Sequence, residues 1–157
     1  MARHVSHVPL RWSDIDSYGH VNNTVYLRYL QEARVEMLYV HAPLRGAEGL
    51  ASGMVVRRHE ISYRAPIRYV SGVDRPEPIR VETWVTAIRA ASFDLGYEIL
   101  ELRPGGDRRV YAVASSTLVP YDFDAGRPRR IRPDERAVLS DYVELDGPTP
   151  SRQGAPA

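Results

Sequence analysis

The chain has 157 residues, and 43% of them are apolar, so it can bury one core of ordinary size. Its formal net charge is +1, with 21 basic and 20 acidic residues. This balance gives no overall field that would attract a nucleic acid or an anionic membrane, and we expect neither as a partner. Cysteine is absent, which excludes disulfides, thiolate metal sites and a cysteine nucleophile. Lysine is also absent, so Schiff-base chemistry is excluded, whereas arginine contacts to phosphate stay available.

The two ends of the chain bear on localisation and on domain limits. The first residues contain no apolar segment of signal-peptide length, and no apolar run approaches the ~20 residues that span a bilayer. We therefore expect a cytoplasmic protein. Residues 1–145 are expected to form a single domain, and the small, polar, proline-rich residues 146–157 are expected to form a disordered tail.

The first predicted elements are a strand and a long helix. Residues 5–12 mix apolar and polar side chains at strand length, and a polar pair ends them. From Asn22 or Asn23 the apolar residues recur every three or four positions, which predicts an amphipathic helix of about five turns. Pro43 and Gly46 are expected to end this helix.

The remaining elements are predicted to be mostly strands. Strand patterns cover residues 53–69, 79–87, 93–102 and 110–119, with a turn at 104–107 and a short helix at 133–142. Short connections between the last three strands indicate an antiparallel meander. Some strands are apolar on both faces, so a face that the helix leaves uncovered needs a second cover. A partner subunit would supply it, and we therefore expect a homo-oligomer, either a dimer or a tetramer.

The densest group of reactive side chains lies at residues 14–23, just before the long helix. These ten positions hold two carboxylates, one imidazole and two carboxamides around a glycine. A carboxylate that faces a helix N-terminus combines a base or nucleophile with unpaired N–H groups that can polarise a carbonyl. This pattern favours an enzyme.

The same segment resembles a known family. Residues 11–27, which contain Asp-Ile-Asp-Ser-Tyr-Gly-His-Val-Asn-Asn, and residues 31–34 resemble the signature of the 4-hydroxybenzoyl-CoA thioesterase-like branch of hotdog-fold acyl-CoA thioesterases. Residues 61–67, 81–85, 92–93 and 97–99 are similar to strand residues of that family. The resemblance implies an α+β hotdog fold, in which a curved antiparallel sheet wraps one long central helix. It also implies hydrolysis of an acyl-CoA thioester, with acyl carrier protein as another possible carrier, and no cofactor.

The resemblance also assigns roles to individual residues. It makes Asp16 the catalytic carboxylate, either as nucleophile or as base for water, and it places the polarising amide at about Asn23. His20 is expected to orient the substrate or Asp16, or to assist proton transfer. The residues expected to bind substrate are Asn22, Tyr26, Arg89 and Ser92. Asp14 is expected to cap the turn rather than to take part in the chemistry.

Other interpretations stay open from the sequence. Asp14, Asp16 and His20 fall within seven residues and combine oxygen and nitrogen ligands, although no further ligand is evident and no metal is expected. Hotdog dehydratases carry an Asn-Pro element that is absent here. A different thioesterase branch places its carboxylate on the helix after His-Gly-Gly, so Glu32 and Glu36 are not expected to be nucleophiles. The main alternative is a non-catalytic protein that binds acyl-CoA or acyl carrier protein as a sensor.

Overall fold

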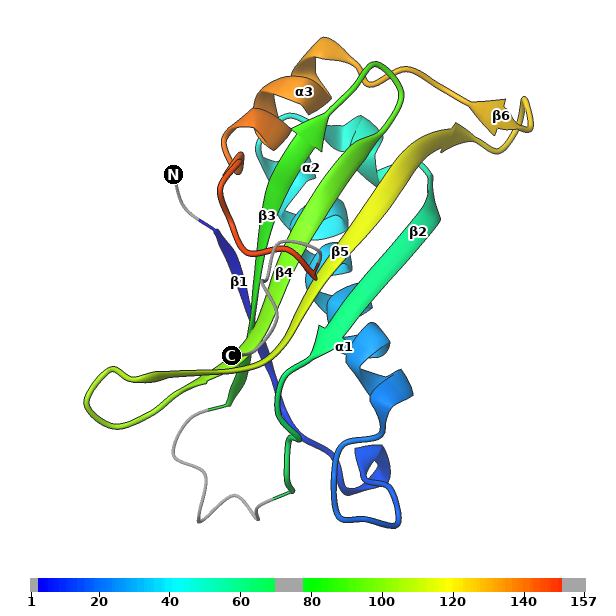
Figure 1. Cartoon of the computed structure of the whole chain (residues 1–157). Coiled ribbons are helices and arrows are strands. Elements are labelled where there is room, and N and C mark those ends of the chain that lie inside the picture. Colours follow the sequence, from blue (N-terminus) through cyan, green and yellow to red (C-terminus); the bar gives the residue numbers. More distant parts are fainter. Residues whose placement is uncertain (1–2, 70–77, 151–157) are drawn as a thin grey trace.

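The computed structural model describes residues 3–69 and 78–150, and in this part of the chain a curved antiparallel sheet wraps a central helix (Figure 1). The sheet has six strands in the order β1-β3-β4-β5-β2, with the short β6 paired to β5. The strands are β1 (His4–Val8), β2 (Met54–Tyr63), β3 (Ile79–Ile88), β4 (Phe93–Leu102), β5 (Arg108–Asp122) and β6 (Arg127–Pro128). The expected meander of β3, β4 and β5 is confirmed.

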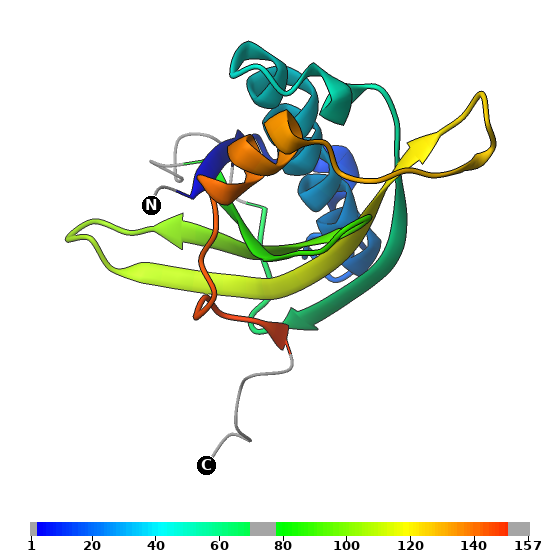
Figure 2. The same ribbon diagram turned by 90° about the horizontal axis from the view of Figure 1, so that it is seen from above.

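The central helix begins at α1 (Asn23–Val35), continues through a π-helical turn (Glu36–His41) and ends in α2 (Ala42–Leu44). Figure 2 shows this helix on the concave side of the sheet, where its apolar stripe is buried. The stripe consists of Val25, Tyr26, Tyr29, Leu30, Ala33, Met37 and Leu38. A further helix, α3 (Pro133–Ser140), lies beside β3. The predicted hotdog fold is therefore confirmed.

Several predicted element limits are wrong, and local chemistry explains them. The first strand ends at Val8 rather than at residue 12, because Pro9 has no N–H for the ladder, and a 3₁₀ turn follows at Trp12–Asp14. The second strand ends at Tyr63 rather than at residue 69. There the chain bends, since the N–H groups of Arg64 and Ala65 both donate to the Tyr111 carbonyl, at 2.7 and 3.2 Å.

The outer face of the sheet is covered in part by the C-terminal segment of the same chain (Figure 2). The Val85 N–H donates to the Tyr142 carbonyl, and the Glu144 N–H donates to the Val85 carbonyl, both at 2.9 Å. Gly147 then lies against the buried Trp84, where a Cβ atom would come within 2.3 Å of the indole nitrogen. Around Trp84 the expectation that a partner subunit covers this face is therefore wrong. The expected disordered tail, 146–157, is described only to residue 150, and residues 151–157 lie outside the described part.

No helix in the described ranges is long and apolar enough to cross a membrane.

Candidate active site

The loop before α1 is fixed by a buried aspartate. Asp14 is only 2% exposed, and its Oδ2 accepts hydrogen bonds from the Tyr29 hydroxyl at 2.8 Å and from the Arg11 N–H at 3.2 Å. The Asp14 carbonyl accepts from the Asn22 N–H at 2.8 Å. Burial, and then the bond to Asp14, raises the pKa of the Tyr29 hydroxyl, which therefore stays a donor to this carboxylate. Asp14 thus joins the loop to the helix, in keeping with its predicted structural role.

Asp16 is held by the tight turn that follows it. Its Oδ1 accepts from the N–H groups of Tyr18 at 2.8 Å and of His20 at 3.2 Å. The turn is closed by the Asp16 N–H, which donates to the His20 carbonyl at 2.8 Å, and it requires Gly19 at a φ of +76°. The described residues donate no hydrogen bond to Oδ2 of Asp16. One carboxylate oxygen is therefore fixed by the backbone, and the other is available for chemistry.

The start of α1 leaves one backbone donor available. Asn22 is the N-cap, and its side-chain oxygen accepts from the Thr24 N–H at 3.0 Å and from the Thr24 hydroxyl at 2.9 Å. The Val25 N–H donates to the Asn22 carbonyl at 2.9 Å. Asn23 is the first helical residue, and its N–H has no acceptor within the helix. Among the first three N–H groups of α1, only that of Asn23 has no acceptor in the cap.

A cavity of about 330 Å³ opens beside this helix end. Four of the predicted site residues line it, namely Asp16, His20, Asn23 and Tyr26. Residues that were not predicted as part of the site complete the wall, namely Val21, Tyr63, Arg64, Ala65 and Pro66. The carboxylate, the imidazole and the open helix end thus share one cavity.

Two tyrosines form an aromatic wall of the cavity. The rings of Tyr26 and Tyr63 meet edge to face, with centroids 5.0 Å apart. The Tyr26 hydroxyl is fixed because it accepts from the Ile67 N–H at 3.2 Å, and the Tyr63 hydroxyl donates to the Asn23 carbonyl at 2.9 Å. Burial raises the pKa of Tyr26 despite the opposing bond from Ile67, and burial also raises the pKa of Tyr63. Both hydroxyls are therefore neutral at physiological pH, and the wall is an uncharged surface beside the carboxylate.

The remaining predicted substrate-binding residues do not line the cavity. Asn22 uses its side chain as the helix cap. Arg89 and Ser92 lie in the β3–β4 turn, where the Arg89 guanidinium binds Asp94 at 2.7 Å and the Arg89 N–H donates to the Ser92 carbonyl at 2.8 Å. β3 begins near the loop, since Ile79 pairs with Val8, but ten residues of strand then carry the chain about 30 Å away. Arg89 and Ser92 therefore lie outside this cavity, and their role in binding substrate stays a prediction.

The three residues considered as a metal site from the sequence do not form one. The Asp14 carboxylate accepts a hydrogen bond from the Tyr29 hydroxyl, and Oδ1 of Asp16 accepts hydrogen bonds from backbone N–H groups. Within the described ranges, the group of three ligand-type side chains whose donor atoms lie within 4.8 Å of one another does not include Asp14, Asp16 or His20. That group lies elsewhere on the molecule.

Comparison with known proteins identifies the family of this chain. Residues 10–139 match the thioesterase-like superfamily, and the chain belongs to this family. A predicted thioesterase from Bacillus stearothermophilus is similar at 27% identity, over 93% of this chain and 100% of that one, with a TM-score of 0.75.

Two further solved structures share the fold. One is the dynemicin thioesterase, at 18% identity over 90% of this chain and 98% of that one, with a TM-score of 0.73. The other is a thioesterase from Thermus thermophilus complexed with coenzyme A and zinc, at 23% identity over 92% of this chain and 95% of that one, with a TM-score of 0.67. No protein of curated function matches the sequence significantly.

Proposed function

We propose that this protein hydrolyses acyl-CoA thioesters to a free acid and coenzyme A. The observation that carries the proposal is the cavity in which the Asp16 carboxylate and the free N–H of Asn23 lie at one helix end. Membership of the thioesterase-like superfamily supports thioester hydrolysis as the reaction class. The motif at residues 14–23 resembles the 4-hydroxybenzoyl-CoA thioesterase-like branch. One structural neighbour was solved with coenzyme A, which makes acyl-CoA the first substrate class to test, and acyl carrier protein the second.

The proposed reaction begins with the thioester carbonyl in the cavity, where its oxygen accepts a hydrogen bond from the Asn23 N–H. In one route, Oδ2 of Asp16 attacks the carbonyl carbon, the carbon–sulfur bond breaks, and the acyl group forms an anhydride with Asp16. Water then hydrolyses the anhydride. In the other route, Asp16 takes a proton from water, and that water attacks the carbonyl carbon directly. In both routes the sulfur leaves as a thiolate that accepts a proton, and the imidazole of His20, which lines the cavity, is the proposed donor.

The substitution Asp16→Asn tests the proposal. It keeps the shape of the side chain and an oxygen that can accept from the turn, but it removes the charge. We expect kcat to fall by about 10²–10⁴, the usual contribution of a positioned acid or base. Release of free thiol from a panel of aliphatic and aromatic acyl-CoAs measures this loss. Asp107→Asn, in the exposed β4–β5 turn, is the matched control and should keep its activity.

Two outcomes would overturn the proposal. Unchanged turnover in Asp16→Asn would exclude the carboxylate. Saturable binding of acyl-CoA without turnover of any substrate in the wild-type protein would instead favour the sensor.

A single turnover in ¹⁸O-labelled water separates the two routes. If Asp16 is a base for water, the label enters the acid product directly. If Asp16 is a nucleophile and water attacks its carbonyl in the anhydride, the label enters Asp16, and the first molecule of product carries none. Mass spectrometry of the peptide that contains Asp16 distinguishes the two outcomes.

We also infer that the protein acts as a homodimer or homotetramer. In support, β2 is an edge strand in the described sheet, and its residues Val56 and Tyr63 are 40% and 47% exposed. Paired edge strands would satisfy the open hydrogen-bonding groups of β2. Light scattering after size exclusion tests this inference, and a monomer at micromolar concentration would contradict it.

A further inference from the structure

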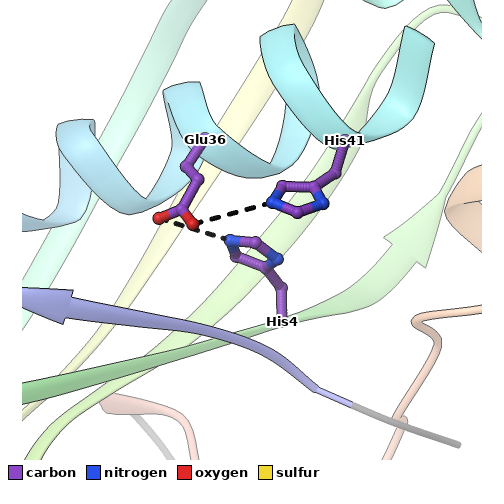
Figure 3. Close-up of side chains that lie close together, drawn as sticks. All are labelled: His4, Glu36 and His41. Carbon is purple, nitrogen blue, oxygen red and sulfur yellow. Dashed lines mark ion pairs between the residues drawn. The ribbon is translucent and has the colours of Figure 1, made fainter. Parts of the chain in front are cut away.

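Two histidines and a glutamate meet at the far end of the central helix (Figure 3). His4 comes from β1, whereas Glu36 and His41 come from the π-helical turn. The Glu36 carboxylate lies between the two rings, with Oε2 at 3.8 Å from Nε2 of His4 and Oε1 at 3.6 Å from Nε2 of His41. The two rings meet edge to face with centroids 5.0 Å apart. One donor atom from each residue lies within 4.8 Å of the others.

The π-helical turn is what places Glu36 and His41 together. In a regular α-helix, residues five apart lie about 140° apart around the axis, so their side chains point in different directions. In a π-helical turn the hydrogen bonds run from residue i+5 to residue i, as the Ala42 N–H donates to the Met37 carbonyl. The wider turn brings residue 41 back over residue 36. Such turns are rare in proteins, and those that do occur often lie at functional sites.

The donor set suits a transition metal rather than magnesium or calcium. Imidazole nitrogens favour zinc, nickel and copper, whereas the alkaline-earth ions require mainly oxygen ligands. The His4 ring is buried, so it would offer its nitrogen to an ion at a site that is largely shielded from solvent.

A second layer of hydrogen bonds orients these groups. The Ser6 hydroxyl donates its one proton to Oε2 of Glu36 at 2.5 Å, and its oxygen accepts from Nε2–H of His4 at 3.1 Å, a bond that a bound ion would replace. His4 and Ser6 are both buried, at 7% and 4% exposed, whereas Glu36 and His41 reach solvent at one side. Metal sites typically combine oriented ligands with such supporting bonds, and the exposed side gives an ion a path of entry.

We propose that His4, Glu36 and His41 form a binding site for a divalent transition-metal ion of the zinc class. In tetrahedral coordination the ligand atoms lie about 3.3 Å apart, and one donor atom from each of the three residues already lies within 4.8 Å of the others, so the separations need to close by at most about 1.5 Å. Three protein ligands leave the fourth position to water. The ion would join the edge strand β1 to the central helix. Glu36 lies 13 positions after Asn23 along the helix, which is about 20 Å, so the proposed metal site is separate from the proposed catalytic cavity.

Direct binding to the untagged, chelator-treated full chain tests the proposal. Calorimetric titration with zinc chloride is expected to show one ion per chain, and titration with magnesium chloride is expected to show no binding. Cobalt chloride should give the visible absorption of a four-coordinate ion, and zinc should displace it. These readouts do not depend on enzymatic activity.

Substitutions locate the ion. His41→Ala changes an exposed residue and should not impair folding, and both it and Glu36→Gln are expected to weaken zinc binding at least about 100-fold. Ser6→Ala, which removes only a supporting bond, is expected to weaken it about 10- to 100-fold. His7→Ala is the matched control, because His7 is an exposed histidine on the same strand, and it should bind zinc like the wild type.

The proposal would be overturned by any of three results. The first is the absence of saturable zinc or cobalt binding. The second is binding that persists unchanged in both His41→Ala and Glu36→Gln, which would place the ion elsewhere. The third is equal loss in His7→Ala, which would indicate nonspecific binding to surface histidines.

Discussion

Proline at position 23 would remove the proposed oxyanion donor and little else. Asn23 is the first residue of α1, the helical position that best tolerates proline, because its N–H has no partner within the helix. The residue before a proline must be extended, and Asn22 already has φ of −57° and ψ of 137°. The Asn23 carbonyl, which accepts from the Tyr63 hydroxyl, would be retained. The cap bonds from Thr24 and Val25 to Asn22 would also be retained.

The expected loss follows from the type of interaction. A directed hydrogen bond to a developing oxyanion contributes about 10²–10³ to kcat, which is about 2.7–4 kcal/mol. The diffuse helix dipole at an open site contributes only about 0.3–1 kcal/mol, or at most roughly fivefold in rate. Since the rest of the helix stays in place, Asn23→Pro should lower kcat by about 10²–10³.

The assay compares Asn23→Pro with Asn23→Ala, which loses the same side chain but keeps the N–H. Both kcat values come from thiol release, and circular dichroism with urea unfolding checks that the two variants are equally folded. A kcat of Asn23→Pro within about fivefold of that of Asn23→Ala would refute the assignment of this N–H as the oxyanion donor.

Two further predictions concern stability on the outer face of the sheet. Gly96→Ala should lower the free energy of unfolding by about 1–3 kcal/mol in urea denaturation, because a Cβ would lie 2.6 Å from the ring of Trp84; an unchanged midpoint would contradict this. A hydrogen bond from Arg3 holds the pKa of Glu144 below its ordinary value of 4.5, against the effect of burial and with the help of the Arg3 charge. The stabilisation is therefore complete above pH 4.5 and is lost as the pH falls through the lower folded value. Glu144→Gln should then be less stable than the wild type at pH 7 and converge with it in acid, and a stability difference that grows in acid would contradict the reasoning.

The half of the candidate site that the loop and the helix start form was predictable from the sequence because it is local. Asp16, His20 and Asn23 lie within eight residues, and a turn followed by a capped helix is specified by short-range chemistry. The apolar period of the long helix likewise predicted Tyr26 on its buried side. The opposite wall was not predicted, although the family-like stretch at 61–67 gave a signal for it, because Tyr63 reaches Asn23 from 40 residues away.

The metal-type cluster gave no signal in the sequence. His4 and Glu36 lie far apart in the chain, and their meeting depends on where β1 pairs along β3. The positions of Glu36 and His41 correspond to no shared face of an α-helix, and only the π-helical turn brings them together. The position of Arg89 and Ser92 outside the cavity has a related cause, since the direction in which β3 runs decides which end of the sheet they reach.

Most elements, the central helix and the reactive loop were readable from the sequence, because they follow from apolar period, turn residues and caps that act over a few positions. The fold class followed from the resemblance of residues 11–27 to a known family. Which distant strands wall the cavity, which segment covers Trp84 and where His4 meets the helix became evident only in three dimensions. Those contacts depend on strand order and register over the whole sheet, and no short stretch of sequence encodes them.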